Sequence, residues 1–300
     1  MIFLKRIFFF VLINVAIIAV LTTVTSVFGI NTYYLEPNGL NLQSLAVFSL
    51  IIGFAGSFIS LLISKWMAKS MMGVEVIKNP TNDEESFLIT KIQQFAQQGG
   101  VNMPEVGIYE SGEVNAFATG WSKNRALVAV SRGLLQQMNR EEVEGVLAHE
   151  MAHVVNGDMV TMALIQGVVN TFVIFAARVA AYAVQTFLAK GEENSAIGGL
   201  SYWLTALLFE ILFGILASIV VMSFSRWREY RADFGGAQFV GKQKMIAALK
   251  RLQSSTNQID NNQKSLATMK MSGKGGITAL FSTHPSLEKR IESLQKALIQ

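Results

Sequence analysis

Long apolar runs come in two pairs along the chain. The first pair covers residues 7–35 and 37–64, and the second covers residues 159–189 and 202–225. Each run can form a helix across the roughly 30 Å hydrocarbon core of a bilayer, which needs about 20 residues. Short polar turns join the members of each pair, so the pattern predicts four transmembrane helices in two hairpins.

Basic residues predict the orientation of the first hairpin. Lys5 and Arg6 precede it, and Lys65 and Lys69 follow its second run, whereas the turn at residues 33–39 carries no Lys or Arg. Because Lys and Arg collect on the cytoplasmic side of membrane proteins, we expect the N-terminus and the chain after Lys65 to be cytoplasmic. A cleaved signal peptide is the competing interpretation, but the first run is too long for one and no small-residue cleavage site follows it.

The second hairpin carries one charge in each run, Arg178 and Glu210. Charged side chains inside a bilayer usually face a partner or a water-filled cavity. The two residues lie at similar distances from the cytoplasmic ends of their runs, so we predict an ion pair between them. A polar path that grips a substrate is the alternative, and protein rather than lipid could cover part of this hairpin.

Shorter patterns outside the hairpins indicate helices and strands of a soluble domain. Thr81 and Glu84 form a capping-box pattern, which predicts a helix that ends near Gly99 and Gly100. The runs that follow favour strands and predict a small antiparallel meander at residues 105–109, 114–118 and 126–131.

Further helices are predicted on either side of the second hairpin. Asn139 and Glu142 can open a helix that ends near Asn156-Gly157. A later helix is expected to begin after Gly235-Gly236. Residues 254–276 have the composition of a turn or a mobile segment, and the spacing of Leu and Ile after residue 286 predicts a final amphipathic helix.

Composition agrees with a membrane protein. Hydrophobic residues make up 51% of the chain and charged residues 15%, which is too apolar for a wholly soluble protein. The formal charge of +4 is small and scattered, so no nucleic-acid partner is expected. We predict four segments in order. An N-terminal transmembrane hairpin covers residues 1–70, and the second transmembrane hairpin covers residues 159–225. One soluble domain is formed by the two remaining segments, residues 71–158 and 226–300.

The chemistry is carried by the sequence His149-Glu150-Met151-Ala152-His153, an HExxH motif inside a predicted helix. Residues four apart share a helix face, so both imidazoles can bind one zinc ion. Glu150 lies beside them, placed to take a proton from the water that attacks a carbonyl carbon. A chance match without metal is the alternative, although two of only three His in the chain lie in the motif.

A catalytic zinc site needs a third protein ligand. The chain has no Cys, which excludes thiolate ligands and disulfides and leaves His and carboxylates. Glu229 and Asp233 are four apart on a helix expected to continue from the last apolar run. One can bind zinc while the other accepts a hydrogen bond from a ligand imidazole. A solvated charge cluster at a helix end explains the spacing equally well.

The chain resembles the HtpX family of membrane metalloproteases, which is related to the CAAX prenyl endopeptidases. Besides the two hairpins, the resemblance rests on four ordered motifs: Asn115-Ala116-Phe117-Ala118-Thr119-Gly120, Leu147 to His153 followed by Asn156-Gly157-Asp158, Ser225 to Asp233, and Phe281-Ser282-Thr283-His284-Pro285. It implies a mainly α membrane protein with a cytoplasmic, α+β, zincin-like metalloprotease domain.

The resemblance also implies roles for individual residues. Glu229 would be the third ligand of one zinc ion, beside His149 and His153, and Asp233 would then support a ligand imidazole. His284 would steady the oxyanion of the tetrahedral intermediate, with helix capping or packing as the alternative. Asn115 would lie at the edge of the cleft that receives an extended substrate, unless it is an ordinary edge-strand residue.

The resemblance implies a role in quality control at the bacterial inner membrane. Expected partners are unfolded or misassembled membrane proteins as substrates, the lipid bilayer, and other membrane proteases. A protease acting inside the bilayer is disfavoured because the polar segment before His149, residues 139–144, would have to enter lipid. A processing protease for a defined lipidated peptide stays open, as does a metal-binding scaffold without activity in which His284 closes the site.

Overall fold

The computed structural model describes residues 34–36, 39–188, 199–262, 282 and 284–298, together with the isolated positions 19, 23, 26 and 27. The chain forms two compact units. Residues 1–60 and 162–221 make the first, and residues 61–161 and 222–300 make the second. The first predicted transmembrane run and the turn at residues 191–198 lie outside the described residues, apart from isolated positions and the end of that run.

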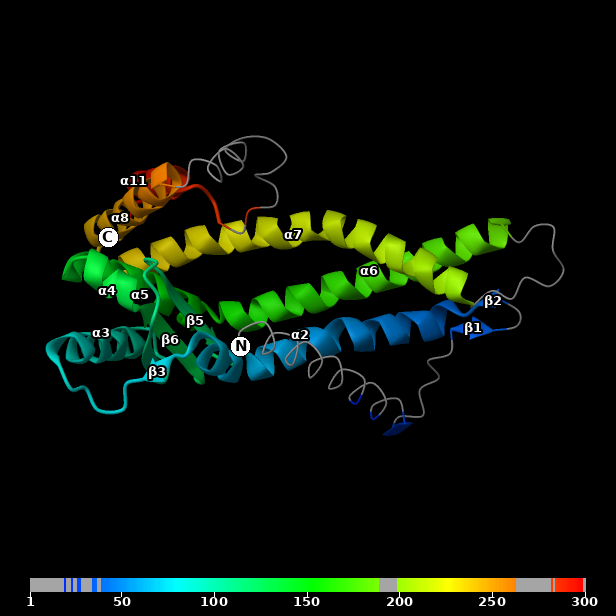
Figure 1. Cartoon of the computed structure of the whole chain (residues 1–300), viewed down its shortest axis with the longest axis horizontal. Coiled ribbons are helices and arrows are strands. Elements are labelled where there is room, and N and C mark those ends of the chain that lie inside the picture. The colour runs from blue at the N-terminus through cyan, green and yellow to red at the C-terminus, as the bar shows by residue number, and fades with distance from the viewer. Residues whose placement is uncertain are drawn as a thin grey trace. The chain divides into compact units, whose positions relative to one another are not determined.

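Three long apolar helices supply the candidate membrane spans in the described part of the chain: α2 (Leu42–Met72), α6 (Asp158–Leu188) and α7 (Leu200–Val240) (Figure 1). Gly53 of α2 meets the backbone of α6 directly, because a Cβ there would lie 2.6 Å from the amide nitrogen of Thr171. Small residues at such crossings let membrane helices pack closely. A two-stranded hairpin, β1 (Leu35–Glu36) and β2 (Gly39–Leu40), precedes α2.

The predicted ion pair between Arg178 of α6 and Glu210 of α7 is present. The Arg178 guanidinium also lies over two aromatic rings, 5.6 Å from the Phe48 centroid and 5.8 Å from the Trp203 centroid. Tyr202 is fully buried beside them and its hydroxyl donates to the Arg178 carbonyl oxygen at 3.4 Å. Aromatic faces and one carboxylate thus surround a cation that hydrocarbon would otherwise exclude.

The second unit contains a mixed four-stranded sheet, which corrects the predicted antiparallel meander. The strand order is β3 (Glu75–Val76), β4 (Glu105–Tyr109), β6 (Ala126–Ser131), β5 (Ala116–Gly120). β4 and β6 pair in parallel, and only β5 with β6 and β3 with β4 run antiparallel. Every residue of β6 is buried, so the most apolar run takes the centre and the less buried β5 takes the edge.

Helices α3 (Asp83–Gln98), α4 (Arg132–Gln137) and α5 (Arg140–Asn156) belong to this unit. The cap of α3 is one residue later than predicted: the Asn82 side chain accepts from the Glu85 amide, while the Glu85 carboxylate accepts from Thr81. Glu85 therefore takes the place assigned to Glu84. The predicted end of α3 at Gly99 is confirmed.

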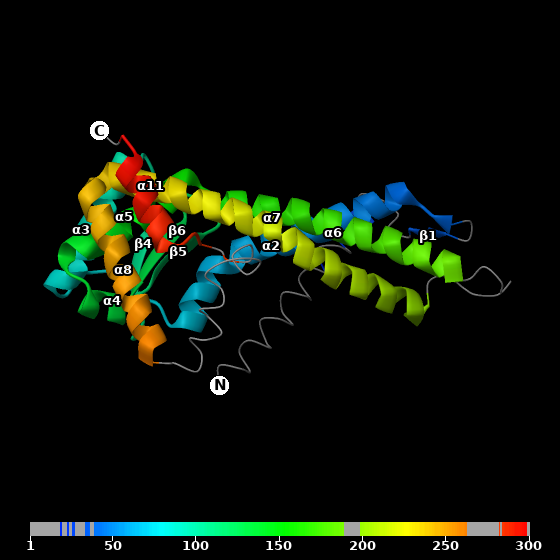
Figure 2. The same ribbon diagram turned by 90° about the horizontal axis from the view of Figure 1, so that it is seen from above.

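Two C-terminal helices complete the second unit, α8 (Lys242–Asn262) and α11 (Leu287–Lys296), and both views show them side by side (Figures 1 and 2). The expected break at Gly235-Gly236 is wrong, because α7 continues to Val240 and the chain turns at Gly241, where φ is +86°. α8 also extends into the segment predicted as a turn or mobile. The rest of that segment, residues 263–276, lies outside the described residues.

Candidate metal centre

Helix α5 presents the two imidazoles of the HExxH motif. The predicted capping box is present, because the Asn139 side chain accepts from the Glu142 amide and the Glu142 carboxylate accepts from the Asn139 amide. The helix ends as predicted at Gly157, whose φ of 67° suits a glycine. One turn apart on this helix, the Nε2 atoms of His149 and His153 face each other at 3.1 Å.

Glu229 of α7 meets both imidazoles. Its Oε2 lies 3.4 Å from His149 Nε2, and its Oε1 lies 3.3 Å from His153 Nε2. For bonds of about 2.05 Å to a tetrahedral ion, ligand atoms stand about 3.3 Å apart. The three side chains, all buried, are the group in the described part of the chain whose ligand atoms lie within 4.8 Å of one another. Their spacing fits a single tetrahedral metal ion.

An orphaned oxygen supports the same fit. Glu229 is 1% exposed, and its Oε2 is buried without a hydrogen bond of acceptable geometry from any described residue. His284 Nδ1 at 2.9 Å, His149 Nε2 at 3.4 Å and Arg290 Nη1 at 3.4 Å lie near this oxygen, but all are out of hydrogen-bonding alignment. A buried carboxylate oxygen without a donor is costly, and a bound cation would satisfy it.

Two glycines bring α7 close enough to α5 for this meeting. A Cβ on Gly235 would stand 2.9 Å from the Cβ of Ala152, and one on Gly236 would stand 3.1 Å from the amide nitrogen of His149. Each distance is shorter than ordinary van der Waals contact. The glycines that suggested a helix break therefore serve close packing between the helix that carries Glu229 and the helix that carries the imidazoles.

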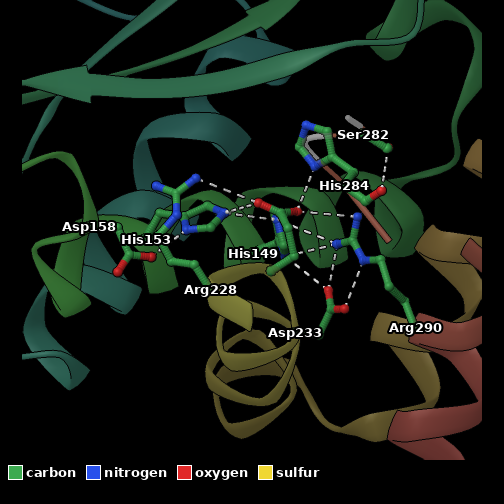
Figure 3. A network of polar contacts seen from close by, with 9 residues as sticks. His149, His153, Asp158, Arg228, Asp233, Ser282, His284 and Arg290 are labelled. Atoms are coloured by element: carbon green, nitrogen blue, oxygen red, sulfur yellow. Dashed lines mark hydrogen bonds and ion pairs between the residues drawn. The ribbon is translucent and has the colours of Figure 1, made fainter. Parts of the chain in front are cut away.

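Each imidazole is also held at its second nitrogen (Figure 3). Asp158 Oδ2 lies 2.6 Å from His153 Nδ1, and Asp233 Oδ1 lies 3.0 Å from His149 Nδ1. Carboxylates in these positions fix the tautomer that leaves Nε2 free for a metal and raise the basicity of the ring. Asp233 is therefore where the spacing predicted, although its role in metal binding stays a prediction.

The electrostatics of the site favour a cation. Burial by itself lowers the pKa of His149, but hydrogen bonds to Asp233 and Glu229 outweigh burial and raise the pKa to about 9. When both imidazoles are neutral, as metal binding requires, four carboxylates and two guanidinium groups leave a formal charge of −2 around them, counting Glu150, Asp158, Glu229, Asp233, Arg228 and Arg290. A divalent ion would neutralise this charge.

The remaining predicted site residues lie at different distances from the centre. Glu150 is half-buried, and its side chain makes no hydrogen bond or ion pair with a residue that the structure describes. His284 is beside Glu229, with 62% of its side chain exposed. Asn115 is exposed before β5 and pairs with Ser131 through its backbone, outside the ligand cluster.

Arg290 and Asp158 were not predicted as site residues. Asp158 occurs in a motif of the resemblance, but nothing in its spacing points to His153. Arg290 is 6% exposed. It falls on the apolar stripe of the last predicted helix, between Leu287 and Ile291, where a charge is out of place. That misplaced charge was the available signal, but the sequence does not reveal which acid it meets.

Comparison with known proteins agrees with the geometry. The model of peptidase family M48 matches residues 82–298. The chain is 52% identical over 294 residues to a "Protease HtpX homolog" of Chlorobium phaeovibrioides and 54% identical over 294 residues to one of Albidiferax ferrireducens, covering 98% of this chain and 99% of each relative. It is 52% identical over 298 residues to "Protease HtpX" of Tolumonas auensis, covering 97% and 99%.

A solved structure shares the fold. The crystal structure of S. mikatae Ste24p matches with a TM-score of 0.65 at 20% identity, covering 97% of this chain and 65% of that one. The likeness at this identity concerns the fold alone. The predicted resemblance is confirmed by the full-length relatives, and the family match spans most of the chain: the chain belongs to peptidase family M48.

Proposed function

We propose that this membrane protein is a zinc-dependent endopeptidase. The observation that carries the proposal is the convergence of His149, His153 and Glu229 on one point, with ligand atoms at the spacing of a tetrahedral ion. Zinc suits two imidazoles and one carboxylate, a ligand set used by peptidases.

An open fourth position favours catalysis over a structural site. A structural zinc is closed by four protein ligands, and the scaffold hypothesis needs His284 as the fourth. Within the described part of the chain, the group of mutually close ligand atoms does not include His284. The metal would therefore keep one position for water or substrate.

The reaction depends on what the side chains do around that position. A bound zinc ion supplies a water of lowered pKa and polarises the scissile carbonyl. The Glu150 carboxylate accepts the proton from the attacking water and delivers it to the leaving amine. Asp158 and Asp233 hold the imidazoles in their metal-binding tautomer. His284, exposed beside Glu229, donates to the developing oxyanion, and Asn115 lines the cleft for an extended substrate.

The cellular setting is also a proposal. The basic residues after residue 64 support a cytoplasmic catalytic unit on the bacterial inner membrane, with a first transmembrane helix near the N-terminus making four spans. Sequence similarity to proteases named HtpX supports a role in removing damaged or misfolded membrane proteins. Processing of one lipidated peptide is the alternative, and cleft shape would decide between the two.

Purified protein in detergent, with unfolded casein as substrate, tests the activity. We expect one zinc per chain, cleavage that a chelator abolishes and zinc restores, and no cleavage by Glu150→Gln with its zinc retained. A matched control is Glu142→Gln, on the same helix but at its capping box. Zinc-independent cleavage, or full activity in Glu150→Gln, would refute the proposal. Reporter fusions after Lys69 and after Arg231 should both be cytoplasmic.

A further inference from the structure

Arg290 is the buried cation of the C-terminal helix α11. Its neighbours on the helix, Ile291 and Leu294, pack with Met245 and Leu249 of α8 in an apolar cluster. A guanidinium is expensive to bury unless carboxylates and hydrogen bonds receive it. Its position on the buried face therefore needs an explanation other than packing.

The guanidinium grips both oxygens of one carboxylate. Arg290 Nε donates to Asp233 Oδ2 at 2.8 Å, and Nη2 donates to Asp233 Oδ1 at 2.6 Å. This bidentate fork fixes the plane of the carboxylate, which a single-point contact from a lysine would not do. Asp233 is 1% exposed, so no water competes for the fork.

The fixed carboxylate in turn meets a metal ligand. Asp233 Oδ1, the oxygen that accepts from Arg290 Nη2, lies 3.0 Å from His149 Nδ1. The third nitrogen of the guanidinium, Nη1, lies 3.4 Å from Glu229 Oε2. Figure 3 shows the Arg290 guanidinium beside both the Asp233 carboxylate and the His149 ring. One side chain from the last helix thus contacts the support of His149 and also lies directly against two of the three candidate ligands, His149 and Glu229.

We propose that Arg290 is a positioning residue for the metal centre. It holds Asp233 in the plane that orients the His149 ring, so docking of α11 completes a site whose ligands lie on α5 and α7. This inference rests on the proposed metal-dependent function, but it concerns metal affinity rather than peptide cleavage. Because the His149 ring is already held in place, metal binding would not have to order it, and the affinity for the metal would be higher.

The affinity for zinc and the visible spectrum of the Co²⁺-substituted protein test this role. Arg290→Met removes the fork but keeps the apolar stem, and Arg290→Lys keeps the charge without the fork, so it stays informative if the first variant fails to fold. We expect both to bind zinc about 10 to 100-fold more weakly, as when other supports of ligand imidazoles are lost. The Co²⁺ spectrum should also change, because it reports ligand geometry.

A double variant shows whether Arg290 acts through Asp233. Asp233→Asn should weaken zinc binding, and adding Arg290→Met should weaken it little further, because both changes break one chain of contacts. Losses that simply add, or wild-type affinity in both Arg290 variants, would overturn the proposal. Reduced cleavage with unchanged zinc affinity would also overturn it, since it would assign Arg290 to the substrate.

A buried charge elsewhere on α5 provides the control. Glu144 is 7% exposed and is not one of the candidate ligands. Its carboxylate forms ion pairs with the Nζ atoms of Lys91, at 2.7 Å, and Lys244, at 2.8 Å. Glu144→Gln should lower thermal stability without changing zinc affinity or the Co²⁺ spectrum. If wild-type protein binds no zinc, the proposed function itself fails; if it binds zinc and the Arg290 variants bind equally well, only the positioning role fails.

Discussion

Adding a single methyl group at Gly235 or Gly236 should weaken metal binding. In an ordinary helix, Ala is favoured over Gly by about 1 kcal/mol, so either substitution would be expected to stabilise α7. At these positions the methyl group meets the neighbouring helix: 2.9 Å from Ala152 Cβ for Gly235, and 3.1 Å from the His149 amide nitrogen for Gly236. The clash with the neighbouring helix therefore opposes the gain in helix propensity.

The distances indicate which effect dominates. Ordinary contact begins at 3.4 Å, so the Gly235→Ala methyl group must move away from Ala152 by at least about 0.5 Å. Overpacking of this kind typically costs about 1–3 kcal/mol, which exceeds the gain in helix propensity. Metal–ligand distances tolerate only about 0.2 Å. A shift of α7 that carries Glu229 away from the imidazoles should therefore lower zinc affinity at least about tenfold.

Gly214→Ala is the matched control, because Gly214 lies on the same helix and a methyl group added there would have no described atom within 4 Å. We expect this variant to bind zinc like the wild type. Chelator competition gives the affinity, and thermal unfolding in detergent gives the stability. Wild-type zinc affinity in both Gly235→Ala and Gly236→Ala, with stability raised as in the control, would show that the close approach of the helices does not set the metal site.

Three other outcomes are expected. Glu229→Ala should lose bound zinc together with activity, and stoichiometric zinc in that variant would remove Glu229 from the ligand set. In the metal-free protein, the raised pKa of His149 means that protonation stabilises the fold fully below about pH 6.5 and that this stability is lost as pH rises through about 9; thermal melts that are flat across that range would contradict it. Arg178→Ala and Glu210→Ala should each destabilise the protein in detergent, with the double variant no worse than either, whereas additive losses would argue against a coupled pair.

Local patterns predicted the parts of the fold that depend on neighbours in sequence. Asn139 and Gly157 mark the ends of α5 because caps and left-handed turns are satisfied within a few residues. The HExxH spacing likewise places His149 and His153 on one face of that helix. The apolar runs predicted α2, α6 and α7 because length and composition suffice for a candidate span.

Three of the misses depend on contacts between distant segments. The parallel pairing of β4 with β6 skips the strand between them, which no local alternation of polar and apolar residues encodes. Gly235 looks like a helix breaker until the helix it packs against is known. Arg290 meets Asp233 across 57 residues of sequence, and spacing within one helix cannot identify such a partner.

The order of the candidate metal ligands along the chain has a consequence for synthesis. His149 and His153 precede the second pair of apolar helices, Glu229 follows it, and Arg290 comes almost at the end. A ribosome that has made the HExxH helix has produced two imidazoles with no third ligand, and it must finish both helices before Glu229 emerges. Under the proposed function, the nascent chain would therefore lack a complete metal site, and would not cut itself or its neighbours, until that hairpin has been translated.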